Sequence, residues 1–260
     1  MRAIWTGAIG FGLVNIPVKI YSATEESNIG LDMLDKKDHS RIRFKRVNEN
    51  TGKEVQWENI VKAYDYEGKY VVLTDEDFKK ASPEKSKILE IQQFVKQEEV
   101  DSMYYESPYY LEPQKAGEKA YALLREALKK TGMVGLGTFV LRSKQLLGIL
   151  KPHEDVVVLN RIRFAQEIRD YSGLNLPSAK SVHLKPAEVK MAEELIKQLS
   201  AKFNIEDYRD TYSDELMRVI EAKAKGKKVT APKMKVVHHQ SDDIVAQLKQ
   251  SISMSRKKAS

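Results

Sequence analysis

The fold is decided near the start of the chain, in the stretch Arg2-Ala-Ile-Trp-Thr-Gly-Ala-Ile-Gly-Phe-Gly-Leu-Val-Asn-Ile-Pro-Val-Lys-Ile-Tyr-Ser-Ala-Thr24. Its second half alternates Ile16, Val18 and Ile20 with more polar residues, a pattern typical of a half-buried β-strand. Glycines within such a run indicate bends or close backbone approach, as at the corner of a barrel. Proline has no N–H for a central ladder, so we expect an edge or a bulge at Pro17. The stretch predicts a β-barrel or a β-sandwich.

Composition excludes several kinds of chemistry. The 260 residues include no cysteine, which excludes disulfides, thiolate metal sites and cysteine nucleophiles. The sequence has neither a signal-peptide pattern nor an apolar run near the roughly 20 residues that a membrane helix needs. We therefore expect a soluble protein of the cytoplasm without a membrane partner.

The positive charge is concentrated at the C-terminal end. Residues 221–260 hold ten lysines and arginines against three acidic residues, which accounts for the whole formal net charge of +7. Residues 1–220 are therefore neutral. If this body binds a polyanion, it must do so by separating its charges on the surface.

A basic cluster follows the first stretch. Six cations fall within eleven residues that contain one acid, Asp38, and they are Lys36, Lys37, Arg41, Arg43, Lys45 and Arg46. From Arg41 to Lys45 the basic residues alternate with Ile42 and Phe44, which on a strand would place three cations on one face. Such a face could follow a phosphate backbone. The alternative is a solvated edge strand that its charges protect from aggregation.

The remainder of the first two thirds is mostly β in pattern. We expect a turn at 50–53, a hairpin from 60–66 and 69–73, a short helix capped by Thr74 and Asp77, and a strand over 87–95. The acids at 75–77 are interpreted as capping residues, with a metal site as the weaker alternative. A helix over 114–130 precedes a meander of strands at 133–141, 145–150 and 156–164, with Arg142 and Lys144 at a hairpin tip.

Four tyrosines lie within 102–111, and they are Tyr104, Tyr105, Tyr109 and Tyr110. They could stack on bases, but packing within a barrel or an interface is favoured because tyrosine suits half-buried strands.

The pattern becomes helical from Pro186 onward. One helix starts there, and a second opens with a capping box from Thr211 to Asp214 and stops at Gly226. A basic linker over 226–240 leads to a capped amphipathic helix over 241–252. That helix is short for independent stability, so the body or a partner must cover its apolar face.

The motifs of common enzymes are missing from the sequence. It contains no phosphate-binding glycine loop, dinucleotide fingerprint, zinc-protease helix or nucleophile elbow, and its five histidines are scattered. This favours a binding protein without cofactor, metal or catalytic residue. Two alternatives stay open: a metal-dependent nuclease, and a nucleoid or RNA-binding protein without preference for ends.

The opening stretch closely resembles the start of the bacterial Ku proteins, which hold broken DNA ends for non-homologous end joining. The resemblance continues in order through Tyr70–Phe78, Pro108–Pro113, Gly117–Leu128, Phe139–Arg142, Asp210–Tyr212 and Glu221–Ala224. The chain departs from many relatives over His39–Gly52, where cysteines would be expected, so no metal role is assigned to that segment.

The resemblance implies a β-rich α+β protein, in which β-barrel cores with extended arms form a homodimeric ring around duplex DNA. It also implies recruitment of a multidomain ATP-dependent DNA ligase through the C-terminal region, in the cytoplasm of a bacterium and near the nucleoid. The expected division is a core with its DNA-encircling arm over 1–185, a helical ligase-recruiting region over 186–226, and a basic linker with a helical tail over 227–260. The candidate phosphate contacts are Arg41, Arg43, Lys45 and Arg46, followed by Lys19, Lys36, Lys37, Arg142 and Lys144.

Overall fold

A computed structural model describes residues 1–81, 87–142, 144–178, 180–227 and 244–258. It divides into two compact units, Met1–Glu26 with Leu31–Asp170, and Ser27–Gly30 with Tyr171–Ser260. No helix in these ranges is long and apolar enough to span a membrane.

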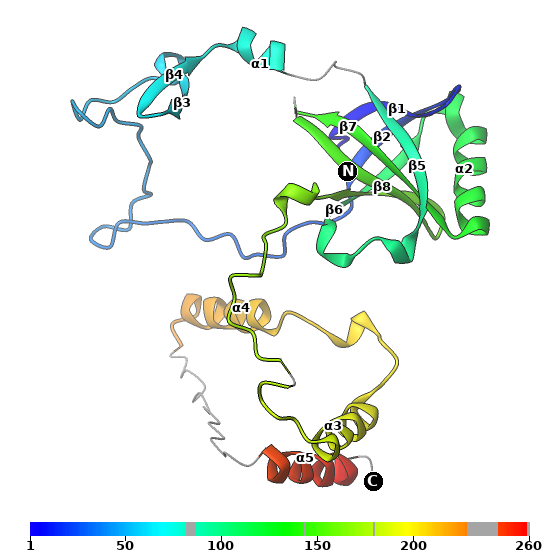
Figure 1. The fold of residues 1–260 in the computed structure, drawn as a ribbon. Helices are drawn as coiled ribbons and strands as arrows, with labels where there is room; N and C mark the ends of the chain where they lie inside the picture. The colour runs from blue at the N-terminus through cyan, green and yellow to red at the C-terminus, as the bar shows by residue number, and fades with distance from the viewer. Residues whose placement is uncertain (82–86, 143, 179, 228–243, 259–260) are drawn as a thin grey trace. The chain divides into compact units, whose positions relative to one another are not determined.

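The first unit contains a closed seven-stranded barrel (Figure 1). Its strands are β1 (Trp5–Phe11), β2 (Val14–Ser22), β5 (Ile88–Lys96), β6 (Tyr105–Pro113), β7 (Met133–Leu141), β8 (Lys144–His153) and β9 (Val156–Ile162). They follow the order β1-β2-β6-β9-β8-β7-β5, and the parallel pairing of β1 with β5 closes the ring. The expected barrel and the meander β7–β8–β9 are confirmed, except that Ser143 of the meander's first turn lies outside the described residues.

The opening stretch forms two strands, β1 and β2, joined by a turn at Gly12 and Leu13. β2 has no bulge at Pro17 and lies between β1 and β6, but its ladder with β6 begins only at Val18, so Pro17 stands at the edge of that pairing as predicted. The Pro17 carbonyl accepts a hydrogen bond from Gln114 N at 2.9 Å, just beyond the end of β6. The missing N–H of Pro17 therefore faces the place where the ladder with β6 ends, and costs no strand hydrogen bond.

Two glycines permit close strand approach beside β5. A Cβ atom at Gly7 would lie 2.2 Å from the Lys87 carbonyl oxygen, and one at Gly137 would lie 2.1 Å from the Glu90 carbonyl oxygen. No side chain fits at those distances, so these positions require glycine for the barrel to close around β5.

The inward rows of the strands form one apolar core, in which Ile9, Ile16, Val18, Leu89 and Leu159 are fully buried. Helix α2 (Glu118–Thr131) adds Tyr121, Leu124 and Leu128 to this core, and it ends at Gly132 with φ 66°. The Tyr121 hydroxyl donates to the Leu111 carbonyl oxygen at 2.7 Å and accepts from the Val157 amide at 2.7 Å. Leu111 and Val157 are the last pair of the β6–β9 ladder, so this hydroxyl ties α2 to the end of that ladder.

Residues 31–81 form an arm with its own small elements (Figure 1). The hairpin of β3 (Lys62–Tyr66) and β4 (Lys69–Leu73) is confirmed, as is α1 (Asp75–Ala81) with reciprocal capping between Thr74 and Asp77. The strand predicted over 41–45 is wrong: residues 31–56 form only two isolated bridges, Leu34 to Arg41 and Val47 to Glu54. Side-chain-capped turns reverse the chain within each bridge, so Ile42 bonds back to Met33, Arg46 bonds forward to Val55, and no continuous strand forms between them.

The second unit contains α3 (Pro186–Leu199), α4 (Thr211–Ala224) and α5 (Ile244–Lys258). Helix α3 starts at the proline as predicted, whereas α4 is capped by the Asp210 carboxylate and not by the Thr211 capping box. Asp210 is the better cap because its oxygen accepts from both Tyr212 N and Ser213 N. Helix α5 runs six residues past the predicted end at 252. It packs against α3, in line with the expectation that another part of the chain or a partner would cover it. The expected linker lies, from 228 to 240, outside the described residues.

Candidate DNA interface

The arm carries the main group of candidate cations, all of them exposed to solvent. Arg41 Nη2 lies 2.6 Å from Asp32 Oδ1, and Lys45 Nζ lies 2.6 Å from Glu54 Oε2. The Arg46 guanidinium stacks over the Trp57 ring, 4.5 Å from its centroid. Lys36, Lys37 and Arg43 make no ion pair with any described residue. The six candidates at 36–46 therefore comprise three unpaired cations, two paired ones and one held by an aromatic ring.

Hydrogen bonds favour the charged forms of Lys45 and Asp38. The bond to Glu54 raises the pKa of the Lys45 ammonium above its usual 10.5. The Ser40 amide and hydroxyl hold the pKa of the Asp38 carboxyl below its usual 3.8. A phosphate that bound Arg41 or Lys45 would have to compete with the carboxylates of Asp32 and Glu54.

Sequence reasoning missed these two acidic partners because both lie outside the eleven-residue cluster. The signal was present in the turns. Asp38 and Asn48 are typical of turns in which a side chain caps the backbone, and a reversal at each one brings Asp32 to Arg41 and Glu54 to Lys45.

The other candidates belong to the barrel. Lys19 lies on β2 opposite Glu112 of β6. Arg142 and Lys144, at the tip of the β7–β8 hairpin, line a cavity of about 450 Å³ together with Arg161 of β9. Arg161 shares one face of β9 with the core residues Val157 and Leu159, and the sequence alone did not distinguish this position from a solvated surface. The neighbouring Arg163 has a structural contact, because its Nη1 donates to the Tyr105 carbonyl oxygen at 2.8 Å.

The tyrosine-rich stretch is part of the barrel wall. Tyr109 packs against the barrel core, and Tyr104 and Tyr105 pack against a second apolar cluster of Val134, Ile149 and Ile162, so the packing interpretation is confirmed for these three. Tyr110 lines a separate shallow cavity with Tyr21 and Glu112.

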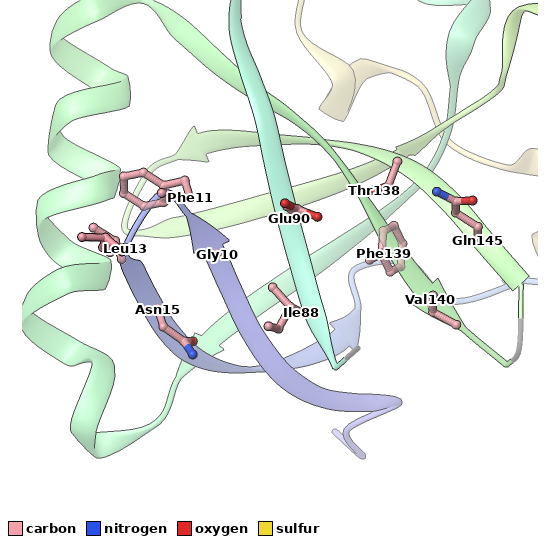
Figure 2. Close-up of a pocket in the computed structure, with 12 residues that line it drawn as sticks. Gly10, Phe11, Leu13, Asn15, Ile88, Glu90, Thr138, Phe139, Val140 and Gln145 are labelled. Carbon is pink, nitrogen blue, oxygen red and sulfur yellow. The ribbon is translucent and has the colours of Figure 1, made fainter. Parts of the chain in front are cut away.

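A cavity of about 610 Å³ lies beside the seam between β1 and β5, and Figure 2 shows the residues that line it. Its polar side chains are those of Asn15, Glu90, Thr138 and Gln145, and no described lysine or arginine lines it. A site with one carboxylate and no cation repels phosphate, so this cavity is not a candidate for DNA contact. Across the described part of the chain, no group of three or more histidine, cysteine, aspartate or glutamate side chains could hold a metal ion.

The chain is similar to proteins of one family. A family model described as Ku, the Ku70/Ku80 beta-barrel domain, matches residues 10–191. The protein named non-homologous end joining protein Ku from Coxiella burnetii is 41% identical over 98% of this chain and 96% of its own length. Proteins of the same name from Bacillus subtilis and Archaeoglobus fulgidus are 40% and 42% identical, over 99% and 88% of this chain and 83% and 90% of their own lengths. Among solved structures, the SPOC domain of human PHD-finger protein 3 matches 62% of this chain and 95% of its own length, at 12% identity and a TM-score of 0.31.

Proposed function

This chain belongs to the Ku family, and we propose that it binds the ends of linear double-stranded DNA in non-homologous end joining. It binds without reading sequence, because its candidate contacts are cations directed at phosphates and not side chains in a groove. The observation that carries the proposal is the pairing of a family-specific barrel with an exposed cluster of six cations at 36–46 of the arm. We assign it no catalytic residue, cofactor or metal.

A ring that encloses the duplex must load at a free end. In a mobility-shift competition, linear duplex should displace a labelled probe and covalently closed circles of equal length should not. Equal competition would leave a nucleoid-type or RNA-binding role, and cleavage of the DNA with magnesium or manganese would indicate a nuclease.

The ring is a homodimer, in which the second copy of the chain covers the arm of the first. The β3–β4 hairpin supports this, because large apolar side chains are exposed on both of its faces: Tyr64 is 65% exposed on one face and Tyr70 79% on the other. A two-stranded hairpin is only marginally stable alone in water, so a partner surface is needed to cover it.

Light scattering at micromolar concentration tests the dimer. The protein should scatter as about twice its chain mass of 29.7 kDa. The double variant Tyr64→Ser/Tyr70→Ser should shift it toward the monomer, whereas Lys79→Gln/Lys80→Gln on α1 should not. A monomeric wild-type protein would contradict the ring.

The arm supplies the main phosphate contacts, through Arg41, Arg43, Lys45 and Arg46 with Lys36 and Lys37. If about six phosphates are neutralised, log affinity falls with log salt at a slope near −5. The triple variant Arg41→Gln/Arg43→Gln/Lys45→Gln should flatten that slope to about −3. The matched control Lys115→Gln/Lys119→Gln/Lys130→Gln removes the same charge from exposed lysines around α2 and should keep the wild-type slope. An unchanged slope in the arm variant would move the interface elsewhere.

The region 186–226 recruits a multidomain ATP-dependent DNA ligase, while 1–185 forms the core and arm, and 227–260 the basic tail. Exposed aromatic residues support this, since Phe203 and Tyr208 stack with ring centroids 6.4 Å apart between α3 and α4. Deleting 186–260 should abolish ligase stimulation. Deleting 227–260 removes most of the tail charge and should chiefly weaken DNA binding. Full ligase stimulation by the larger deletion would refute the assignment.

A further inference from the structure

The end of the barrel opposite the Gly12–Leu13 turn carries a cavity of about 450 Å³. Five strands and the segment before β1 contribute to it. The lining residues are Ile4, Ser22, Tyr109, Leu141, Arg142, Lys144, Leu146 and Arg161.

This cavity is the mouth of the barrel interior. On β8, Lys144 is two residues from the core residue Leu146, and on β9, Arg161 is two residues from the core residue Leu159. On β6, Tyr109 is likewise two residues from the core residue Leu111. Because side chains two apart on a strand share a face, the inward rows that are apolar in the core become cationic at this end. Barrel mouths are common sites of ligand binding.

The mouth has an excess of positive charge. Arg161 Nε lies 3.0 Å from Glu106 Oε2, and both side chains are about 70% covered, at 30% and 28% exposure. Arg142 and Lys144 make no ion pair with any residue that the structure describes. Arg142 sits at φ 51° in the turn between the paired residues Leu141 and Lys144, so both cations lie where the β7–β8 ladder ends.

The neutral donors and the apolar wall of the cavity limit the class of ligand that it can bind. The Tyr109 ring packs against the core, and its hydroxyl makes no hydrogen bond within the described ranges. The Ser22 hydroxyl donates its proton to the Thr24 carbonyl oxygen at 2.7 Å. Ile4, Leu141 and Leu146 form the remaining wall. The site thus combines hydrogen-bond donors and two uncompensated cations with an apolar wall that cannot bind a second charged group. These features suit one compact anion with several acceptor oxygens.

We propose that this barrel mouth binds a phosphate group through Arg142, Lys144 and Arg161, with Tyr109 as a fourth donor. The inference deepens the proposed function, because DNA is the source of the phosphate. That phosphate belongs either to the 5′ end of a strand or to the backbone within it. The cavity differs from the arm in that its cations line one cavity, whereas those of the arm are spread along an exposed segment.

The test uses the double variant Arg142→Gln/Lys144→Gln, with Lys119→Gln/Lys130→Gln on α2 as the matched control. Both are measured on blunt duplexes with 5′-phosphate and with 5′-hydroxyl ends. We expect at least about a tenfold loss of affinity in the cavity variant, as for a lost charge-assisted hydrogen bond, and a salt slope flatter by about 0.9. A loss confined to the phosphorylated duplex identifies a terminal phosphate, and an equal loss on both identifies a backbone phosphate. A cavity variant that binds both duplexes like the control overturns the proposal.

Inorganic phosphate separates this inference from the proposed function. At equal ionic strength, replacing chloride by phosphate should raise the melting temperature of wild-type protein more than that of the cavity variant, because binding stabilises the folded state. Tyr109→Phe should give an intermediate rise. Equal rises in wild-type and cavity variant would overturn the site even if DNA ends are bound. Failure of end binding together with a wild-type-specific rise would leave the site standing and refute only the function.

Discussion

The hydroxyl of Tyr121 offers a sharp test of how the barrel is held together. It stands between the Val157 amide and the Leu111 carbonyl at the end of the β6–β9 ladder, and it bonds to both at 2.7 Å. Burial raises the pKa of this phenol above its usual 10.0, and the Val157 amide only partly offsets that rise. Tyr121 therefore stays neutral and bonded throughout the neutral range. Tyr121→Phe deletes one oxygen and leaves the packing of the ring intact.

The cost of Tyr121→Phe follows from the two groups left behind. An unsatisfied buried donor or acceptor costs about 1–3 kcal/mol. The amide and the carbonyl face each other, so a small movement of β9 toward β6 recovers part of that loss. We expect a net destabilisation of about 2 kcal/mol, which lowers the melting temperature by about 4–8 °C for a domain of this size.

Urea and thermal unfolding monitored by tryptophan fluorescence provide the assay. The chain has two tryptophans, so a Trp57→Phe background leaves Trp5 of β1 as the sole reporter within the barrel. The matched control is Tyr109→Phe, whose hydroxyl has no partner among the described residues. A Tyr121→Phe variant within about 0.5 kcal/mol of the control would refute the bridging role of this hydroxyl.

Three further outcomes are expected. Asp32→Asn/Glu54→Gln should free Arg41 and Lys45 from their exposed ion pairs, and so tighten DNA binding and steepen its salt dependence, measured by fluorescence anisotropy; weaker binding would count against these cations as phosphate contacts. Gly137→Ala should destabilise the barrel by about 3 kcal/mol in urea unfolding, because its methyl group would overlap the Glu90 carbonyl, whereas Gly173→Ala, with open space around it, should have little effect; equal stabilities would contradict the close approach at β5. The Ser213 hydroxyl and the backbone amides hold the pKa of the Asp210 carboxyl below 3.8, so the stability that this carboxylate adds to α4 is present above pH 3.8 and is lost as pH falls through the lowered pKa. Circular dichroism should show this loss of helix in acid for the wild type and not for Asp210→Asn. Identical acid profiles would exclude Asp210 as the source.

Periodicity predicted most of the fold where strands have neighbours on both sides. The alternation of Ile16, Val18 and Ile20 marks β2, since each of these side chains enters the core. The glycine-rich half before it does not alternate in the same way, so the break between β1 and β2 at Gly12 was not foreseen. The alternation of Arg41, Arg43 and Lys45 predicted a strand that does not form, because an isolated stretch needs a partner strand and the turns beside it provide none.

The candidate sites show the same limit. The sequence identified the arm cations because they are adjacent in the chain. It did not identify the barrel mouth, because only closure of the barrel brings Ser22, Tyr109, Arg142 and Arg161 to one cavity. Nor did the sequence distinguish free cations from paired ones, since Asp32 and Glu54 reach their partners only after the chain reverses.

The most direct test of the central claim is the affinity for DNA with and without ends. Wild-type protein should bind a linear duplex and ignore a covalently closed circle of the same sequence, and linearising the circle with a single cut should restore binding. Equal binding to the circle before and after the cut would contradict a protein that loads at DNA ends.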